Sequence, residues 1–196
     1  MTFTQARFTS FEEYLTTEAS DLSEGRYEYW NGELIPVMAE SFWNDTIALF
    51  IQVVLMSIGV PFQLIRPHNC EIEVIGTPRT RFPDLTVLDE IHLTLLDRRL
   101  TITRQMPPPS LVVEVVSPGD DRSENYLRDY QDKRDQYAAI GIPEYWLIDP
   151  DRSWVMVGTL IENQYQFKTF SADEMIVSPS FPSVDVTASQ VLNAQR

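Results

Sequence analysis

A strand–helix–strand pattern constrains the fold of this chain more than any other feature. Residues 111–116 read LVVEVV, an almost continuous apolar run that is typical of a strand buried on both faces. Residues 122–140 then show helical spacing of apolar positions, and Gly141 supplies the stop. A second apolar run follows at residues 144–149. This order predicts a βαβ unit, in which the two strands lie parallel.

Local signals predict several further elements. Asn31-Gly32 lies between two strand-like runs and predicts a β-hairpin. Apolar positions recur at helical spacing from Ser41 to Ile58, so we expect a long buried helix there. We also expect a capping box at residues 10–13, an N-cap at Asp120 or Asp121 for the helix of residues 122–140, and short strands at residues 62–66, 70–75, 82–88, 153–158 and 165–170.

These elements predict an α/β (α+β) fold: a central mixed β-sheet flanked by helices, with an N-terminal helix and a β-hairpin. The hydrophobic content of 43% is enough for one substantial core. No change in composition marks a second domain, so we expect residues 1–196 to form a single domain.

Targeting and redox signals indicate where the protein works. The first residues lack the basic start and apolar run of a signal peptide, and no stretch approaches the roughly 20 apolar residues that span a bilayer. Cys70 is the only cysteine, which excludes an internal disulfide and a zinc site built on thiolates. We therefore expect a soluble cytoplasmic protein with no membrane partner.

The charge is strongly acidic but unevenly distributed. The chain has 15 basic and 29 acidic residues, a net charge of −14, which disfavours a polyanionic partner. Residues 66–134, however, hold ten basic and twelve acidic residues, against five and seventeen in the rest. The middle of the chain is thus the part most compatible with nucleic acid.

Glu114 lies at the centre of a predicted buried strand, where an unpaired carboxylate costs on the order of several kcal/mol. Asp84 opens another predicted strand thirty positions earlier. Neighbouring strands would bring both carboxylates to one cation. Mg²⁺ prefers oxygen ligands and usually takes one or two protein carboxylates. We therefore expect Asp84, Glu114 and the Val115 carbonyl to bind Mg²⁺ or Mn²⁺.

Lys133 lies one helical turn from Tyr137, at the edge of the helix face that should meet the sheet. From there its long side chain can extend toward Glu114. A lysine in that position can orient an attacking water and stabilise negative charge. The alternative is a solvated helix charge paired with Asp129 or Asp132.

The acids and histidines also have structural interpretations. Asp84 could cap a turn through its side chain, and Glu114 could pair with an arginine such as Arg81. His68 and His92 lack the spacing of a metal site and are expected to be loop or surface residues.

Several motifs, taken in order, resemble those of a known family. Their order and spacing are similar to those of the Uma-two family, a family of predicted endonucleases within the PD-(D/E)XK restriction-endonuclease-like superfamily. The residues that carry the resemblance are Tyr27-Glu28, Asn31-Gly32-Glu33-Leu34, Pro83-Asp84, the segment from Leu111 to Pro118, Lys133 with Tyr137, and the segment from Gly141 to Pro150.

The resemblance implies a restriction-endonuclease-like core. It also implies a metal-dependent nuclease that acts on DNA, with Asp84 and Glu114 as metal ligands. In the superfamily a lysine lies two residues after the glutamate, but this chain has Val116 there, and the resemblance transfers that role to Lys133. Glu28 resembles a glutamate of the N-terminal element that binds a second metal or a metal-bound water, although an outward solvated position is equally compatible. Superfamily nucleases often pair to cut two strands, so the resemblance also implies a homodimer.

The leading hypothesis is thus a Mg²⁺-dependent endonuclease that hydrolyses DNA phosphodiester bonds, with Asp84, Glu114, Lys133 and Glu28 as catalytic residues. Two alternatives remain open at this point. One is a non-catalytic binding or scaffold module on the same fold, because position 116 lacks the lysine. The other is a metal-dependent hydrolase of a small nucleotide, which an acidic surface hinders less than a long polyanion.

Overall fold

A six-stranded mixed sheet forms the centre of the protein. The computed structural model describes residues 7–17, 25–37, 39, 41–96, 99–117 and 128–194. The sheet strands are β3 (Ile65–Pro67), β6 (Leu85–Val87), β8 (Leu111–Val115), β9 (Glu144–Asp149), β10 (Trp154–Ile161) and β11 (Gln164–Ser171). Their order is β11-β10-β9-β8-β6-β3. β8 and β9 are parallel, and the other neighbours are antiparallel.

Two smaller sheets accompany the central one. β1 (Tyr27–Trp30) and β2 (Glu33–Pro36) form the predicted hairpin. Its turn residues Asn31 and Gly32 both have positive φ, 48° and 95°, as the favoured two-residue hairpin turn requires. The third sheet has the order β5-β4-β7, made of β4 (Glu71–Glu73), β5 (Thr80–Arg81) and β7 (Thr101–Ile102).

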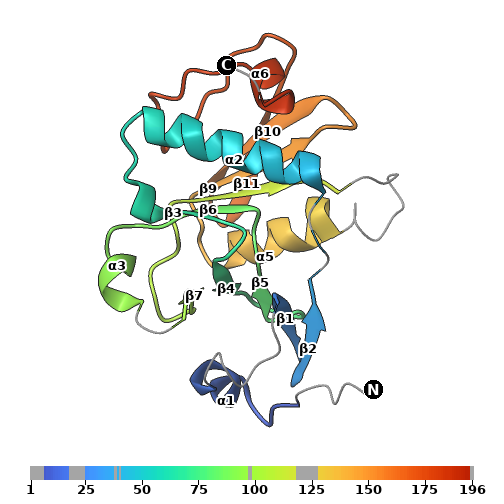
Figure 1. The fold of residues 1–196 in the computed structure, drawn as a ribbon, viewed down its shortest axis with the longest axis vertical. Helices are drawn as coiled ribbons and strands as arrows, with labels where there is room; N and C mark the ends of the chain where they lie inside the picture. Colours follow the sequence, from blue (N-terminus) through green and yellow to red (C-terminus); the bar gives the residue numbers. More distant parts are fainter. Residues whose placement is uncertain are drawn as a thin grey trace.

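Helices cover both faces of the central sheet (Figure 1). The helices are α1 (Phe11–Thr16), α2 (Phe42–Ser57), α3 (His92–Leu95), α5 (Lys133–Ala139) and α6 (Ala188–Leu192), with a 3₁₀ turn at Phe62–Leu64 and a π-helical turn at Arg128–Asp132. α2 and α6 lie at one end of the molecule, while α1 and the hairpin lie at the other (Figure 1). Within the described residues, no helix is long and apolar enough to cross a membrane.

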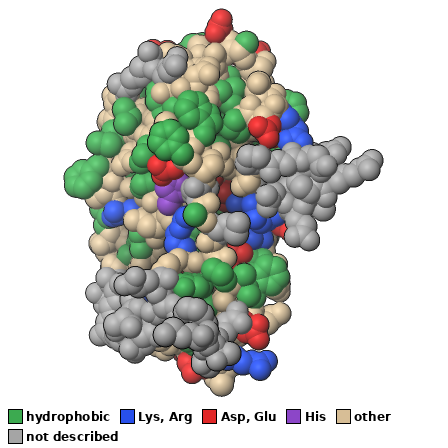
Figure 2. All heavy atoms as spheres, turned by 45° about the vertical axis from the view of Figure 1, so that its right-hand side comes forward, with side chains coloured by type: hydrophobic (Ala, Val, Ile, Leu, Met, Phe, Trp, Pro, Cys, Tyr) green, Lys and Arg blue, Asp and Glu red, His purple; other side chains and the backbone are tan. Residues whose placement is uncertain are grey.

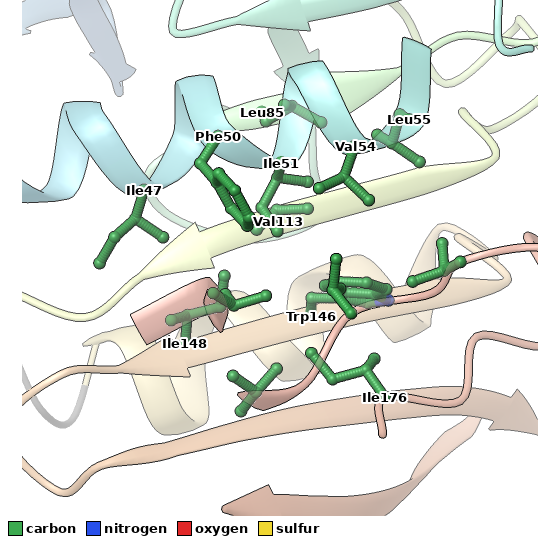
Figure 3. Close-up of a cluster of buried hydrophobic side chains, with 14 of the residues drawn as sticks. Ile47, Phe50, Ile51, Val54, Leu55, Leu85, Val113, Trp146, Ile148 and Ile176 are labelled. Carbon is green, nitrogen blue, oxygen red and sulfur yellow. The ribbon is translucent and has the colours of Figure 1, made fainter. Parts of the chain in front are cut away.

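α2 forms where its sequence predicts a helix. The Ser41 side chain accepts a hydrogen bond from the Asn44 backbone N–H and caps the first turn. Gly59, just past the helix, has a positive φ of 95°, which a residue without a Cβ adopts without strain. The buried face of the helix packs on β3 and β8, and it shares one core with side chains of β9 (Figure 3). The labelled side chains of the helix are Ile47, Phe50, Ile51, Val54 and Leu55.

Alternation along β8 decides where Glu114 points. Val113 and Val115 belong to the core that α2 covers. Val112 and Val116 belong to a second core that includes Tyr137 of α5. Because successive side chains of a strand point to opposite faces, Glu114 faces α5. The sheet thus buries a carboxylate in an apolar layer beneath the helix that carries Lys133.

The predicted βαβ unit is confirmed, because α5 connects two parallel neighbours, β8 and β9. The predicted stop is also present: Gly141 follows α5 with a positive φ of 82°. The described part of that helical segment begins with the π-helical turn, and the expected N-caps Asp120 and Asp121 lie outside the described residues.

Three expectations need correction. The segment of residues 62–66 is not one strand, because residues 62–64 form the 3₁₀ turn and β3 begins at Ile65. The capping box is not reciprocal: Ser10 accepts from the Glu13 N–H, but the Glu13 carboxylate accepts from Thr9 instead. His92 is fully buried rather than at the surface, and its ring contacts the Pro107 carbonyl at 2.8 Å.

Candidate functional site

Glu114 receives a partner on each carboxylate oxygen. The Lys133 ammonium donates to Glu114 Oε2 at 2.7 Å, and the Tyr137 hydroxyl donates to Oε1 at 2.6 Å. The Glu114 side chain is 1% exposed, whereas that of Lys133 is 12% exposed. The lysine therefore connects a buried carboxylate to the surface of the protein, as the sequence predicted for its side chain.

α5 places these two donors together. Lys133 and Tyr137 are four residues apart, and positions i and i+4 of a helix share a face. Burial, followed by the Glu114 charge, raises the pKa of Tyr137 well above its usual value of 10.0. The hydroxyl hence stays protonated and keeps donating to the carboxylate at any physiological pH.

Asp84 lies beside Glu114 at the start of the neighbouring strand. Leu85 pairs with Val113 in the antiparallel ladder, so the next positions along the two chains are Asp84 and Glu114. Asp84 is 4% exposed, and its Oδ2 accepts the Val115 backbone N–H at 2.6 Å. This hydrogen bond fixes the carboxylate against the strand that carries Glu114.

The backbone of Val115 links both acids to α2. Its N–H donates to Asp84, and its carbonyl accepts a hydrogen bond from Asn44 Nδ2 at 3.3 Å. Asn44 is buried in the first turn of α2. A carbonyl oxygen has two lone pairs, so this contact leaves room for a second interaction.

His68 joins the site, although sequence analysis assigned it only to a loop or the surface. Its Nδ1 lies 3.6 Å from Asp84 Oδ1, and its Nε2 lies 3.1 Å from Asp45 Oδ1 of α2. The backbone is held as well: its N–H donates to the Asp84 carbonyl, and Arg26 donates to the His68 carbonyl. No local sequence signal marks this residue, because the contacts join three segments that are distant in the chain.

Acidic, basic and histidine side chains lie close together on one face of the molecule. Figure 2 shows one face of the molecule on which a histidine side chain lies among acidic and basic side chains, with hydrophobic side chains gathered above them. An acidic chain therefore presents both signs of charge around its candidate site.

Glu28 lies in a different network. Its Oε1 accepts from the Arg81 guanidinium at 3.0 Å, and its Oε2 is 3.4 Å from Trp30 Nε1. Arg81 is buried and also donates to Gln136 Oε1 at 2.8 Å. Gln136 belongs to α5, next to Tyr137. The hairpin is thus tied to the helix that carries Lys133, while Glu28 itself contacts Arg81.

The structural alternatives can now be compared with the contacts. Glu114 pairs with Lys133, and Arg81 pairs with Glu28, so the suggested pairing of Glu114 with Arg81 is wrong. Asp84 bonds across to β8 rather than capping a local turn. Lys133 contacts the sheet rather than standing as a solvated helix charge.

The donor set fits a hard divalent cation. Asp84, Glu114 and the Val115 carbonyl offer only oxygen atoms, and they lie on two adjacent strands. Mg²⁺ usually takes one or two carboxylates and keeps several waters. Among the described residues, no group of three or more His, Cys, Asp or Glu side chains forms a metal cage. Two carboxylates and one carbonyl are a donor set of the kind that Mg²⁺ takes together with water.

A second buried glutamate provides a contrast. Glu144 of β9 is fully buried, and its carboxylate accepts from Trp146 Nε1, the Ser178 hydroxyl and the Ser180 N–H. Neutral donors satisfy it, and they attach the C-terminal segment to the sheet. Glu114 differs because one of its donors is a cation that reaches the surface.

Comparison with known proteins gives a structural relative and a family. A crystal structure of a putative nuclease belonging to DUF820 from Anabaena variabilis ATCC 29413 is similar in fold, with a TM-score of 0.65 and 20% sequence identity. The match covers 93% of this chain and 97% of that chain. No match was found among curated proteins. The likeness shows that this chain shares the fold of that structure, a mixed central sheet flanked by helices.

The family comparison agrees with the sequence motifs. The model of the Uma2 (Uma-two) family, described as "Putative restriction endonuclease", matches residues 11–189. This range contains every candidate site residue discussed above. Since the match covers most of the chain, the protein belongs to the Uma2 family.

Proposed function

We propose that this protein hydrolyses DNA phosphodiester bonds as an endonuclease that depends on Mg²⁺ or Mn²⁺. The observation that carries the proposal is the contact between Lys133 and Glu114 beside Asp84. Membership of a family described as restriction endonucleases supports nucleic acid as the substrate. The lone cysteine supports a reducing, cytoplasmic setting, and we treat residues 1–196 as one functional domain.

Asp84, Glu114 and the Val115 carbonyl would hold the metal ion. When bound, such an ion lowers the pKa of a water ligand and neutralises charge on a phosphate. The residues themselves keep the site in order. The Val115 N–H holds Asp84, and the Tyr137 hydroxyl orients Glu114.

Lys133 supplies the positive charge that the superfamily places on the strand. Its ammonium has three N–H donors, and Glu114 Oε2 accepts from it at 2.7 Å. An ammonium in this position can donate to an attacking water or to a phosphate oxygen as negative charge develops there. Its partial exposure supports this role, because a substrate must be able to reach it.

Glu28 would act from the hairpin side. Arg81 holds its carboxylate at 3.0 Å, and Arg81 also bonds to α5 through Gln136. We propose that Glu28 binds a metal-bound water or a second ion near the substrate. Because enzymes of this superfamily often cut two strands as pairs, we also propose that the protein acts as a homodimer.

A cleavage assay with matched lysine variants tests this function. Single-stranded and duplex DNA are incubated with Mg²⁺ or Mn²⁺ and the parent protein, Lys133→Met or Lys168→Met. Lys168 is the only other lysine and is exposed on β11, away from the acids in the sheet order. We expect a rate loss of about 100-fold or more for Lys133→Met and parent activity for Lys168→Met. Equal rates for the two variants would refute the role of Lys133.

Calorimetric titration with Mn²⁺ separates the enzyme from a scaffold on the same fold. We expect binding by the parent protein and loss of binding in Asp84→Asn, because the amide removes the negative charge that attracts the ion. A parent protein that neither binds metal at millimolar concentration nor cleaves DNA would favour the scaffold.

A further inference from the structure

Arg66 differs from several other arginines of this acidic protein in its contacts. Several arginines pair with a carboxylate: Arg79 with Glu73, Arg81 with Glu28, Arg99 with Glu71 and Arg152 with Asp149. Arg66 has no such partner in the described part of the chain, and its Nε is buried without a hydrogen-bond acceptor. Arg66 is half-buried, and without a carboxylate partner among these residues its positive charge is available to a ligand.

The sheet register places Arg66 next to the candidate site. In the ladder from β3 through β6 to β8, Arg66 pairs with Thr86, and Thr86 pairs with Val112. These cross-strand neighbours share a face, and Val112 lies on the same face as Glu114, two residues along β8. Arg66 and Glu114 are thus on one face of the sheet.

Two positions further along the same ladder, His68 lies opposite Asp84. The His68 N–H donates to the Asp84 carbonyl at 3.0 Å, which continues the β3 to β6 pairing by one step. Arg66 is two residues before His68, or roughly 7 Å along an extended strand. Arg66 therefore lies about two strand residues away from the pair formed by His68 and Asp84.

The Arg66 side chain stands at an edge of the central sheet. Burial raises the pKa of the Cys70 thiol to about 12, and the Arg66 charge acts in the opposite direction. Among the strands that the structure describes, β3 lies at the edge of the central sheet. A cation at a sheet edge beside an acidic site is well placed for a phosphate.

We propose that Arg66 binds a backbone phosphate of the nucleic acid, adjacent to the phosphate that is hydrolysed at Asp84 and Glu114. This inference rests on the proposed function and adds a substrate-binding residue to it. A guanidinium is suited to the task because its planar N–H groups bind two phosphate oxygens together and stay charged at every working pH.

The acidic composition gives this contact particular weight. With a net charge of −14, general attraction cannot bring a polyanion to the protein. Binding must instead depend on a few cations at the site, of which Lys133 is occupied by Glu114. Within the described residues, Arg66 has no carboxylate partner to release before it meets a phosphate.

The salt dependence of DNA binding tests the proposal. Binding of a fluorescent single-stranded oligonucleotide is measured by anisotropy in EDTA, which prevents cleavage, at several salt concentrations. The variants are Arg66→Gln, Arg66→Lys and the control Arg104→Gln, in which an exposed arginine loses its charge. One phosphate contact contributes a slope of about 0.7 in a plot of log K against log salt.

We expect Arg66→Gln to weaken binding equally for unrelated oligonucleotide sequences and to reduce the slope by about 0.7. Arg66→Lys keeps the charge and should retain the parent slope, which also shows that the site tolerates substitution. Arg104→Gln should retain the parent slope. A slope in Arg66→Gln equal to that of the parent, or no binding by the parent protein, overturns the inference.

The outcome is distinguishable from failure of the proposed function. If the parent cleaves DNA and Lys133→Met does not, while Arg66→Gln binds and cleaves like the parent, only the phosphate contact is wrong. If binding depends on Arg66 but no metal supports cleavage, the contact stands and the nuclease function fails.

Discussion

Replacing Lys133 by Met should destabilise the folded protein by about 3 kcal/mol in metal-free buffer. Removing one partner of a buried ion pair typically costs about 3–5 kcal/mol, because the other charge stays buried. Glu114 is 1% exposed, and of its two donors Lys133 and Tyr137 only the Tyr137 hydroxyl would remain. The partial exposure of Lys133, 12%, favours the lower end of the range.

A double-mutant cycle isolates this interaction. Urea unfolding gives the free energy of unfolding for the parent, Lys133→Met, Glu114→Gln and the double variant. Once Glu114 is neutral, the lysine deletion should cost less than about 1 kcal/mol, so the two sites should couple by roughly 2 kcal/mol. Lys168→Met, on an exposed lysine, should lie within about 0.5 kcal/mol of the parent. A cost below 1 kcal/mol for Lys133→Met, or simple additivity, would show that Glu114 does not depend on the lysine.

Three further predictions follow from the buried polar groups. Tyr137→Phe should lower the free energy of unfolding by about 1.5–3 kcal/mol, against about 1 kcal/mol for Tyr165→Phe. The reason is that Tyr137 donates to a carboxylate, whereas Tyr165 donates to the Ile142 carbonyl. Equal losses for the two variants in urea unfolding would contradict this prediction. Burial raises the pKa of the Cys70 thiol from 9.0 to about 12. The folded protein should therefore resist iodoacetamide at pH 9 and react only after unfolding. The stability that this pKa shift contributes is complete below pH 9 and is lost as the pH rises to about 12. Glu144→Gln should lower the urea midpoint without changing Mn²⁺ affinity in calorimetry, since neutral donors hold Glu144; a loss of affinity would place Glu144 in the metal site.

Elements with a local signal were predictable from the sequence. The hairpin follows from Asn31-Gly32, whose turn needs two residues with positive φ, and α2 follows from apolar spacing that ends before Gly59. The parallel pairing of β8 and β9 follows from the helix between them. In each case the determining residues lie within a few turns or one connection of each other.

The site was predictable only in part, because its contacts are long-range. A glutamate in a valine strand needs a partner, and helical spacing singled out Lys133; the structure brings the two together at 2.7 Å. The roles of Asp84, Glu114, Val115 and Lys133 in catalysis or metal binding remain predictions.

Other parts of the site lacked any local signal. His68 reaches the site through Asp45 of α2 and Asp84 of the central sheet, segments that lie far apart in the sequence. The Arg81 link between Glu28 and Gln136 has the same character. Burial of His92 likewise depends on a contact with Pro107 that spacing does not encode.

The rate of Mn²⁺-dependent cleavage by Glu114→Gln is the most direct test of the nuclease assignment. The amide is nearly isosteric and can still meet Tyr137 and Lys133, so circular dichroism should show a folded protein, and the assay is run on equal amounts of it. We predict that the parent cuts a DNA oligonucleotide in Mn²⁺ but not in EDTA, and that Glu114→Gln shows only the background rate. A folded Glu114→Gln protein that cuts as fast as the parent would contradict the assignment of Glu114 to the catalytic metal site.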